Sequence, residues 1–290
     1  MGPGTAQSGQ RLALSIGFSP CPNDTYIFNA LVHNHVGIDG VALQPEVLAD
    51  VETLNEWALE GRLDVTKLSF HALGHVTTDY VLLRSGSALG YGCGPLLVAG
   101  RSIDRAQVAG LTVAIPGIYT TAAALLKMYT PAANRLEVMR FDEIMPAIAD
   151  GRVDCGVIIH ESRFTYQRAG LQLVEDLGVW WEKETGCAIP LGCIAAKRSL
   201  GREIIARIDA AVRESVCWAR QHPGAGMDYV RQHARELDDK VIQEHIKLYV
   251  THFTEDIGSQ GLAAIDTFMV RGRKAGLLPA VAGNLTLAKI

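Results

Sequence analysis

The sequence predicts an α/β protein in which two lobes face each other across a cleft, followed by a helical C-terminal segment. Three observations support this fold class: a strand–loop–helix unit near the start, a phrase that recurs 90 positions later, and a change to amphipathic helices after about residue 200. A single doubly wound sheet is the alternative, but it would leave the ordered repeat unexplained.

The composition is that of an ordinary globular protein. The chain has 290 residues, 48% of them hydrophobic, and a formal net charge of −4, so it can bury a large core and shows no sign of nucleic-acid binding. Residues 1–10 are small and polar, which predicts a disordered lead-in rather than a secretory signal. No segment is long and apolar enough for a bilayer, and the six cysteines form no CxxC pair. We therefore expect a cytoplasmic protein with reduced cysteines and no membrane partner.

The first unit joins an apolar run to a helix through a stiff loop. Residues 12–18 predict a buried parallel strand, and a helix is expected over residues 26–33. Two prolines stiffen the loop, and residues 23–25 are of the types that cap a helix start. The free N–H groups of such a junction could seat a ligand carboxylate or phosphate beside Asn23. The alternative is a capped turn that binds no ligand.

One phrase occurs twice. Residues 60–69 and 150–159 both place Gly-Arg, an apolar residue and Asp before a short apolar strand, and the two turn glycines are Gly61 and Gly151. Each copy is expected to follow a helix, because glycine readily adopts the left-handed conformation found after a helix end. These helices are predicted over residues 51–60 and 141–150.

Two further echoes keep the same order along the chain. Residues 111–115, with a helix expected over 122–129, restate the first strand–loop–helix unit. Residues 94–102 resemble 190–199 and are expected to form two connecting strands, one leaving the first lobe and one returning to it. The predicted lobes are residues 11–93 plus 195–290 for the first and residues 94–194 for the second.

After about residue 200, apolar residues recur at spacings of three and four, as packed amphipathic helices require. We expect these helices to pack mostly on the first lobe. They are predicted over residues 202–221, 227–234, 239–251 and 260–275. The whole arrangement is the layout of periplasmic binding proteins of the second type.

Three places that follow strand ends are expected to meet at the cleft, since functional residues of parallel sheets lie at the carboxyl ends of strands. Lys67, inside an apolar strand, either extends its ammonium to the rim or meets an anion. Thr120 and Thr121 are expected to cap a helix, and their hydroxyls could also bind a ligand carboxylate. His160 takes the position that Phe70 holds in the first copy, and it suits a general base with a pKa near neutrality.

Other kinds of chemistry have no motif in this chain. It lacks a Gly-x-Gly-x-x-Gly turn, a Walker loop and a Gly-x-Ser-x-Gly elbow. No histidine spacing fits a metal, and the histidines of the tail, His245 among them, are expected in surface or packing roles. Trp180 and Trp181 could line a wall for an aromatic ligand or pack at the lobe surface. We expect no metal and no cofactor.

The motifs together resemble those of the 1,4-dihydroxy-6-naphthoate synthases, enzymes of the futalosine route to menaquinone. The resemblance covers nearly the whole chain after residue 10, and its most specific phrases are Ser-Pro-Cys-Pro-Asn-Asp-Thr at 19–25 and His-Glu-Ser-Arg-Phe-Thr-Tyr at 160–166. It implies the two-lobed fold and a carbon–carbon lyase that needs no cofactor. The implied small-molecule substrate is cyclic dehypoxanthinylfutalosine, and the implied products are 1,4-dihydroxy-6-naphthoate and dihydroxyacetone.

The resemblance also implies roles for particular residues. His160 matches the proton acceptor of the family. The matching substrate-binding positions are Lys67, Leu68, Ser69, Thr120 and Thr121. Asn23 is a second-tier candidate whose role stays open.

Two other functions are compatible with this fold class. A solute receptor would be expected to carry an export signal or a lipidation cysteine, and the first residues suggest neither. A chorismate dehydratase, a sister enzyme of the same pathway, would share the two-lobed fold, but the two specific phrases argue against it.

Overall fold

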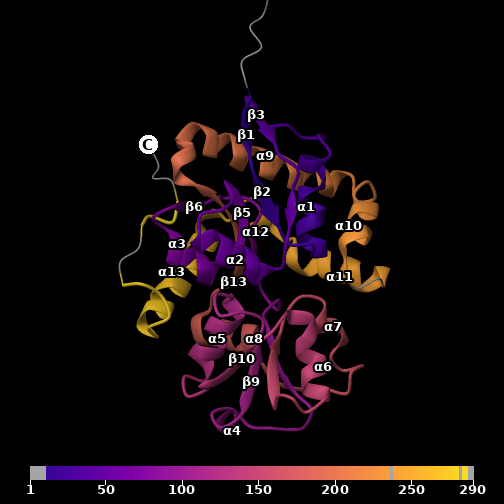
Figure 1. Ribbon diagram of the computed structural model, residues 1–290, viewed down its shortest axis with the longest axis vertical. Helices are drawn as coiled ribbons and strands as arrows, with labels where there is room; N and C mark the ends of the chain where they lie inside the picture. The colour runs from indigo at the N-terminus through magenta and orange to yellow at the C-terminus, as the bar shows by residue number, and fades with distance from the viewer. Residues whose placement is uncertain (1–10, 236–237, 281–282, 287–290) are drawn as a thin grey trace, which may run out of the picture.

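A computed structural model describes residues 11–235, 238–280 and 283–286 of the chain. The predicted disordered lead-in, residues 1–10, lies outside the described residues. Figure 1 shows two lobes stacked along the long axis, one formed by the two ends of the chain and one by its middle. Each lobe is built on its own sheet.

The sheet of the first lobe has the strand order β4-β2-β5-β13-β6, and β7 pairs with β13 beside it. Its strands are β2 (Ile16–Phe18), β4 (Val47–Leu48), β5 (Val65–Ser69), β6 (Tyr80–Leu82), β7 (Ala88–Gly90) and β13 (Ile189–Lys197). Strand β2 runs parallel to β4 and β5, as expected, whereas β13 is antiparallel to its neighbours. The helices between these strands are α1 (Pro22–Val32), α2 (Val51–Leu59) and α3 (Phe70–Val76).

The sheet of the second lobe has the order β10-β9-β11-β8-β12. Its strands are β8 (Leu96–Ala99), β9 (Thr112–Ile115), β10 (Arg135–Val138), β11 (Cys155–Ile158) and β12 (Gln172–Asp176). The helices of this lobe are α4 (Arg105–Val108), α5 (Thr121–Tyr129), the short η1 (Phe141–Glu143), α6 (Ile144–Ala149), α7 (Ser162–Thr165) and α8 (Leu177–Thr185). The lobe boundaries stay a prediction, although β13 joins the first sheet along its whole length, including residues 189–193.

The sequence repeat corresponds to the same strand register in both sheets. Ala196 of β13 pairs with Val65 of β5, and Ala99 of β8 pairs with Cys155 of β11. These are the residues that the echoes align, and both pairings are antiparallel. The two turn glycines also agree, since Gly61 has φ 65° and Gly151 has φ 70°. The echoes therefore reflect one structural unit that is used twice.

Two details of the first unit differ from the expectation. The single strand predicted over residues 12–18 is broken at Ser15 into β1 (Leu12–Leu14), which pairs with β3 (Val41–Leu43), and β2. Ser15 leaves the strand because its backbone N and its Oγ both donate to Asp64 Oδ2, at 2.9 and 2.8 Å. The helix predicted over 26–33 begins earlier, at Pro22, because proline at the first helical position already has a suitable φ and needs no donor.

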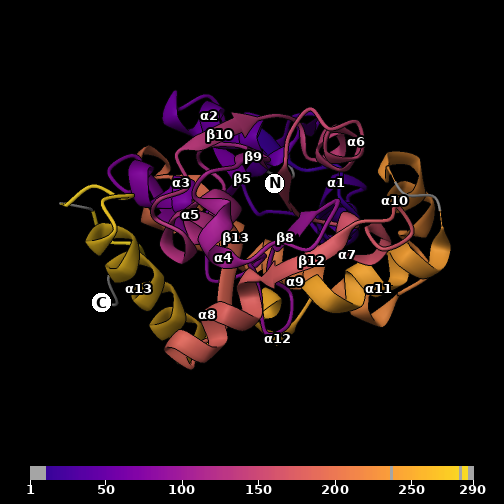
Figure 2. The same cartoon turned by 90° about the horizontal axis from the view of Figure 1, so that it is seen from below.

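The C-terminal segment is helical, as predicted, and packs mainly on the first lobe. Its helices are α9 (Arg202–Gln221), α10 (Met227–His233), α11 (Asp239–Tyr249), the unexpected short α12 (His252–Glu255) and α13 (Gly258–Lys274). Helix α9 is anchored to α1 by hydrogen bonds from Tyr26 Oη to the Ala219 carbonyl (2.7 Å) and from Ser215 Oγ to the Ile27 carbonyl (2.6 Å). Seen from below, α13 lies beside α8 of the second lobe (Figure 2), where Phe268 packs on Trp181.

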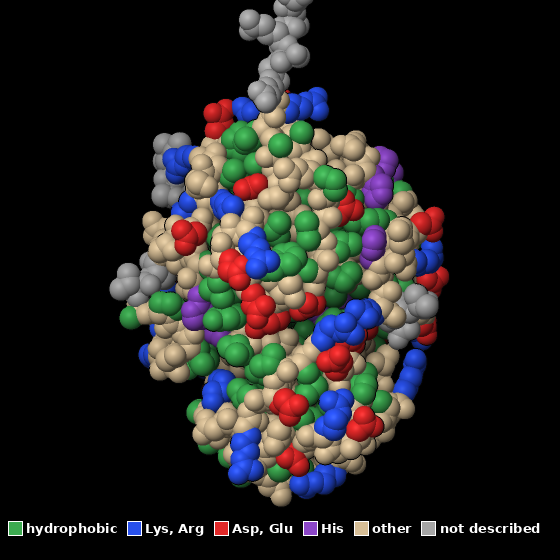
Figure 3. Space-filling view, in the orientation of Figure 1, with side chains coloured by type: hydrophobic (Ala, Val, Ile, Leu, Met, Phe, Trp, Pro, Cys, Tyr) green, Lys and Arg blue, Asp and Glu red, His purple; other side chains and the backbone are tan. Residues whose placement is uncertain are grey.

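The surface and the helices add two observations. On the face drawn in Figure 3, Lys and Arg side chains are interspersed with Asp and Glu rather than gathered in one stripe. Within the part of the chain that the structure describes, we find no helix with both the length and the apolar character needed to cross a membrane.

Candidate active site

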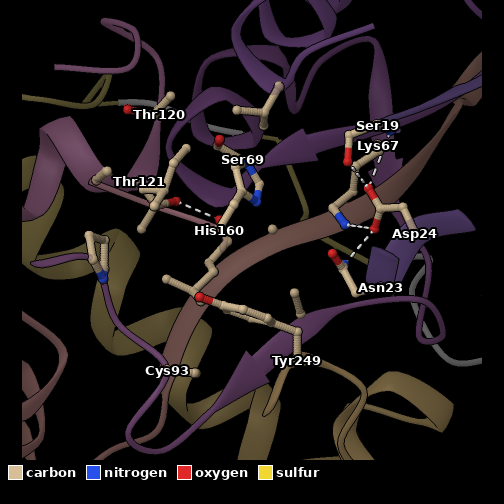
Figure 4. Close-up of a pocket in the computed structure, with 17 residues that line it drawn as sticks. Ser19, Asn23, Asp24, Lys67, Ser69, Cys93, Thr120, Thr121, His160 and Tyr249 are labelled. Carbon is tan, nitrogen blue, oxygen red and sulfur yellow. Dashed lines mark hydrogen bonds and ion pairs between the residues drawn. The ribbon is translucent and has the colours of Figure 1, made fainter. Parts of the chain in front are cut away.

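A cavity lies between the two lobes at the ends of their sheets (Figure 4). It encloses about 630 Å³ that protein atoms do not fill, part of it open to solvent. The first lobe and the C-terminal helices contribute Ser19, Asn23, Asp24, Val51, Lys67, Ser69, Ala88, Leu191, Gly192 and Tyr249. The connecting segment and the second lobe contribute Cys93, Pro95, Thr120, Thr121, Ala122, Ile159 and His160. The three places expected to meet at the cleft therefore do meet.

The loop before α1 holds a carboxylate of its own. The N-cap of α1 is Cys21, and residues 23–25, which we expected to be caps, lie in the first helical turn. Asp24 turns back toward the loop, where its Oδ2 accepts hydrogen bonds from Ser19 Oγ at 2.6 Å and from Ser19 N at 3.3 Å. An internal anion thus occupies part of the junction that we expected to receive a ligand anion.

Lys67 meets this internal anion. Its ammonium forms an ion pair with Asp24 Oδ1, and the two residues are only 5% and 1% exposed. Asn23 Nδ2 donates to the same carboxylate at 2.8 Å. A buried ion pair is favourable only when further hydrogen bonds compensate for the lost hydration, and Ser19 and Asn23 supply them here. Of the two alternatives for Lys67, the structure therefore shows the contact with an anion, and that anion belongs to the protein.

His245 completes the network from the C-terminal segment. Its Nε2 lies 2.9 Å from Asn23 Oδ1, and because Asn23 uses its amide nitrogen on Asp24, the imidazole Nε2–H is the donor. Of the surface and packing roles expected for the histidines of the tail, His245 has the packing role, because it is fully buried and its ring lies against Tyr249, and the hydrogen bond to Asn23 adds to it. A signal was present in the sequence, since His245 lies three residues after Ile242 and four before Tyr249, on the buried face of α11.

His160 lies just beyond the end of β11, with a backbone φ of 58°. A non-glycine residue in the left-handed region is strained, and such residues are concentrated at functional sites. Its ring packs edge-on against Phe141, with the ring centroids 4.9 Å apart, and its Nδ1 lies 3.4 Å from Cys21 Sγ. Desolvation lowers the pKa of His160 to about 4, with opposing smaller effects of Asp24 and Lys67. We expected a pKa near neutrality, and that expectation was wrong because the half-buried ring loses much of its hydration against the surrounding side chains.

The two threonines use their hydroxyls within the protein. Thr120 caps α5, as expected, by accepting from Ala123 N at 3.1 Å, and it donates to the Gly117 carbonyl at 2.7 Å. Thr121, expected to be a cap as well, is the first residue of α5, and its Oγ1 donates across the lobes to the Leu191 carbonyl at 2.8 Å. A ligand at this helix start would therefore compete with the carbonyls for these hydroxyl protons.

The end of β5 presents its residues alternately, as a strand must. Lys67 and Ser69 line the cavity, whereas Leu68 is fully buried in the hydrophobic core behind it. Any contact of Leu68 with a ligand would come from its backbone. Trp181 is also buried in the core, and neither Trp180 nor Trp181 is among the residues that line this cavity.

Glu52 of α2 connects the two lobes beside the cavity. Its Oε1 accepts from Tyr119 N at 2.9 Å, and its Oε2 accepts from Asn55 Nδ2 at 2.9 Å. Asn55 in turn accepts from the backbone N of Ser69 at 2.8 Å. Burial raises the pKa of Glu52, and Gly117 packs so closely on it that an alanine Cβ would lie 2.2 Å from the carboxyl carbon. The wall of the cavity at Ser69 is thereby tied to the opposite lobe.

Among the described residues, no group of three or more His, Cys, Asp or Glu side chains is placed to hold a metal ion.

Arg163, three positions after His160 in the sequence, donates to the Gly94 carbonyl at 2.5 Å and pairs with Asp176 at 2.6 Å. It thus braces the segment that connects the lobes.

The sequence profile of a family described as menaquinone biosynthesis matches residues 14–274. The chain belongs to this family. A 1,4-dihydroxy-6-naphthoate synthase of Thermus thermophilus is 52% identical over 265 residues, which cover 91% of this chain and 96% of that relative. One of Streptomyces coelicolor is 45% identical over 273 residues, covering 92% and 95%. These matches confirm the resemblance, and with it that this member of the menaquinone biosynthesis family is an enzyme.

Solved structures confirm the predicted fold class. A protein from Archaeoglobus fulgidus superposes with a TM-score of 0.87 at 31% identity, covering 94% of this chain and 100% of its own. The alkanesulfonate-binding protein of Xanthomonas axonopodis pv. citri, solved with MOPS, has a TM-score of 0.71 at 12% identity and covers 94% and 96%. At that identity the second match indicates the fold alone. The menaquinone biosynthesis family member has the periplasmic-binding-protein-like fold.

Proposed function

We propose that the interlobe cavity binds cyclic dehypoxanthinylfutalosine and converts it to 1,4-dihydroxy-6-naphthoate and dihydroxyacetone, with His160 as the general base. The substrate is a small molecule, and the reaction takes place in the cytoplasm. The names of the relatives support the product, and the sequence resemblance supports the substrate. The observation that carries the proposal is the placement of His160, a strained residue whose ring lines a cavity between two lobes.

The surroundings of His160 keep its imidazole unprotonated. Desolvation lowers the pKa to about 4, so at neutral pH the ring is neutral with a lone pair free to accept a proton, and the same desolvation makes it a weaker base than a free imidazole. His160 removes a proton next to an activated carbon, the carbon–carbon bond to the three-carbon fragment breaks, and the new ring becomes aromatic. The substrate is divided into two products without a net oxidation, so no redox partner is needed. The hydrogen bond from Tyr119 N to Glu52 joins the two lobes beside the cavity, and closure of the lobes around the substrate would exclude water from the reaction.

The test uses the purified enzyme and the cyclic substrate, with product formation followed by chromatography and absorbance. The unmutated enzyme should release naphthoate and dihydroxyacetone in equal amounts. His160→Ala should lower kcat by about 10²–10⁴, the usual contribution of a general base. His222→Ala is the matched control, because His222 is exposed at the end of α9, and it should keep full activity. An enzyme that forms no naphthoate would refute the reaction, and a His160→Ala enzyme with more than about a tenth of the activity would refute the base.

A further inference from the structure

The partner of His160 Nδ1 is a cysteine that lies outside the cavity wall. Cys21 Sγ is 3.4 Å from Nδ1, and Cys21 is 5% exposed. His160 lines the cavity and Cys21 does not. The Nδ1 side of the ring therefore faces away from the cavity, and Nε2 is the nitrogen left for a ligand.

Both groups are neutral at neutral pH. Burial, and after it the negative charge of Glu161, raises the pKa of the Cys21 thiol well above its ordinary value. The contact is therefore a hydrogen bond between neutral groups, not the thiolate–imidazolium pair of a nucleophilic cysteine. It has two possible directions, because either the thiol donates to Nδ1 or Nδ1–H donates to the sulfur. In the first case Nε2 already carries a hydrogen and has no lone pair with which to accept another proton.

We propose that Cys21 is a positioning residue, whose sulfur accepts the Nδ1–H of His160 and so fixes the tautomer in which Nε2 can take the proton of the substrate. This inference rests on the proposed role of His160 as the base. In the step itself, the proton passes from the substrate carbon to Nε2 and its electron pair stays on the substrate. The Nδ1 hydrogen stays bonded to the nitrogen and hydrogen-bonded to the sulfur throughout, so the thiol is neither oxidised nor deprotonated.

Among the described residues, no other side chain is placed to accept a hydrogen bond from Nδ1–H of His160. The charged groups that act on His160 are Asp24, Lys67 and Asp50, and the rings that pack on it belong to Phe141 and His245. None of them is within hydrogen-bond distance of Nδ1 among the described residues, where only the Cys21 contact is found. When the sulfur is removed, the preference of His160 for the Nδ1–H tautomer should therefore be lost.

The local structure favours variants that still fold. Cys21 caps α1 with its carbonyl, which accepts from Asp24 N and Thr25 N at 3.0 Å each, and its side chain makes no cap hydrogen bond. Cys21→Ala and Cys21→Ser keep this carbonyl. Serine also keeps an acceptor for Nδ1–H, whereas alanine removes it.

The decisive measurement is the nitrogen NMR spectrum of the imidazole rings, with His160 assigned by comparison with His160→Gln. The unmutated protein should show His160 protonated at Nδ1, Cys21→Ser should keep this tautomer, and Cys21→Ala should shift it toward Nε2–H. Protonation at Nε2 in the unmutated protein would overturn the proposal even if neither variant folded. A tautomer unchanged in folded Cys21→Ala would overturn it as well. This result does not depend on the reaction catalysed, so it is separate from any failure of the proposed function.

Kinetics give a second test with a matched cysteine. Cys21→Ala should lower kcat by about ten- to a hundredfold with little change in KM, an effect of the size found when the hydrogen-bond partner of a metal-bound histidine is removed. Cys217→Ala, on α9 and away from the cavity, should leave kcat unchanged. A Cys21→Ala enzyme with the unmutated kcat would show that the sulfur does not position the base.

Discussion

The two lobes are copies of one unit, but their equivalent strands end differently. In the first lobe β5 carries Lys67 and continues through Ser69 directly into α3 at Phe70. In the second lobe the matching position of β11 is Val157, and beyond the strand end the chain turns left-handed at His160, the counterpart of Phe70. The register of both strands against β13 and β8 is the same, so the difference is confined to the side chains and the last turn.

This comparison shows how a duplicated frame can give a cavity two chemically different walls. The shared register brings the ends of β5 and β11 to opposite walls of one cavity. Each wall then carries one group that the other lacks, an ion pair in the first lobe and a desolvated imidazole in the second. The cavity is therefore asymmetric in charge although the backbone around it is repeated.

The largest effect is expected from removing Lys67, whose counterpart in the second lobe is Val157. Lys67→Met should lower the free energy of unfolding by about 3–5 kcal/mol, because it leaves Asp24 buried without its cation. Lys197→Met is the matched control. Lys197 pairs with Asp64 at 3.4 Å with about a quarter of each side chain exposed, so its loss should cost about 1 kcal/mol or less.

Denaturant unfolding of the two variants measures this difference. Adding Asp24→Asn to Lys67→Met should recover part of the lost stability, since the uncompensated charge is then gone. If Lys67→Met and Lys197→Met lowered the free energy of unfolding equally, the buried Lys67–Asp24 pair would be no more important for stability than the more exposed pair.

The second effect concerns the imidazole of His160 beyond the end of β11, a position that Phe70 holds in the first lobe. Because the pKa of His160 is lowered to about 4, its basic form predominates above that pH. The kcat/KM of the enzyme should therefore be nearly flat between about pH 5.5 and 7.5 and should fall only as the pH approaches 4. An imidazole with the ordinary pKa of about 6.5 would instead lose roughly tenfold by pH 5.5. A profile that rises through pH 6.5 would show that desolvation does not control the base.

The smallest effect tests the feature that both lobes share. Gly61 and Gly151 have φ of 65° and 70°, and a Cβ at either position would meet no atom within 4 Å. Replacing either by alanine should therefore cost only the left-handed strain of about 1–2 kcal/mol, and the two costs should be equal. Thermal or denaturant unfolding of Gly61→Ala and Gly151→Ala would measure them. Clearly different losses would mean that the two turns are equivalent in shape but not in energy.

Local patterns in the sequence were sufficient to predict most of the architecture. The strands, the turn glycines and α9 follow from apolar periodicity and glycine placement, which act within a few residues. The start of α1 was misplaced because the types of residues 23–25 were interpreted without the effect of Pro22 at the first helical position. Rules that consider one residue type at a time cannot decide which of two competing helix-start signals sets the first residue of the helix.

The site was predicted only in part, for a different reason. Lys67 and His160 could be singled out because each is unusual within its own strand or repeat. Their partners could not, since Asp24 is 43 positions from Lys67, and Cys21 is 139 positions from His160. The lowered pKa of His160 likewise arises from loss of hydration against the surrounding side chains, which no short stretch of sequence encodes.

The hydrogen bond between Asn23 and His245 joins residues 222 positions apart in the sequence. Because the ribosome makes the chain from its N-terminus, this separation sets the order in which the parts of the site appear. The second sheet has all five of its strands once Asp176 has emerged, whereas the first sheet then still lacks β13, the strand between β5 and β6. Helix α11, which brings His245 and Tyr249 to the cavity, emerges later still. The nascent chain therefore has Lys67 and His160 long before it has the complete cavity that they line.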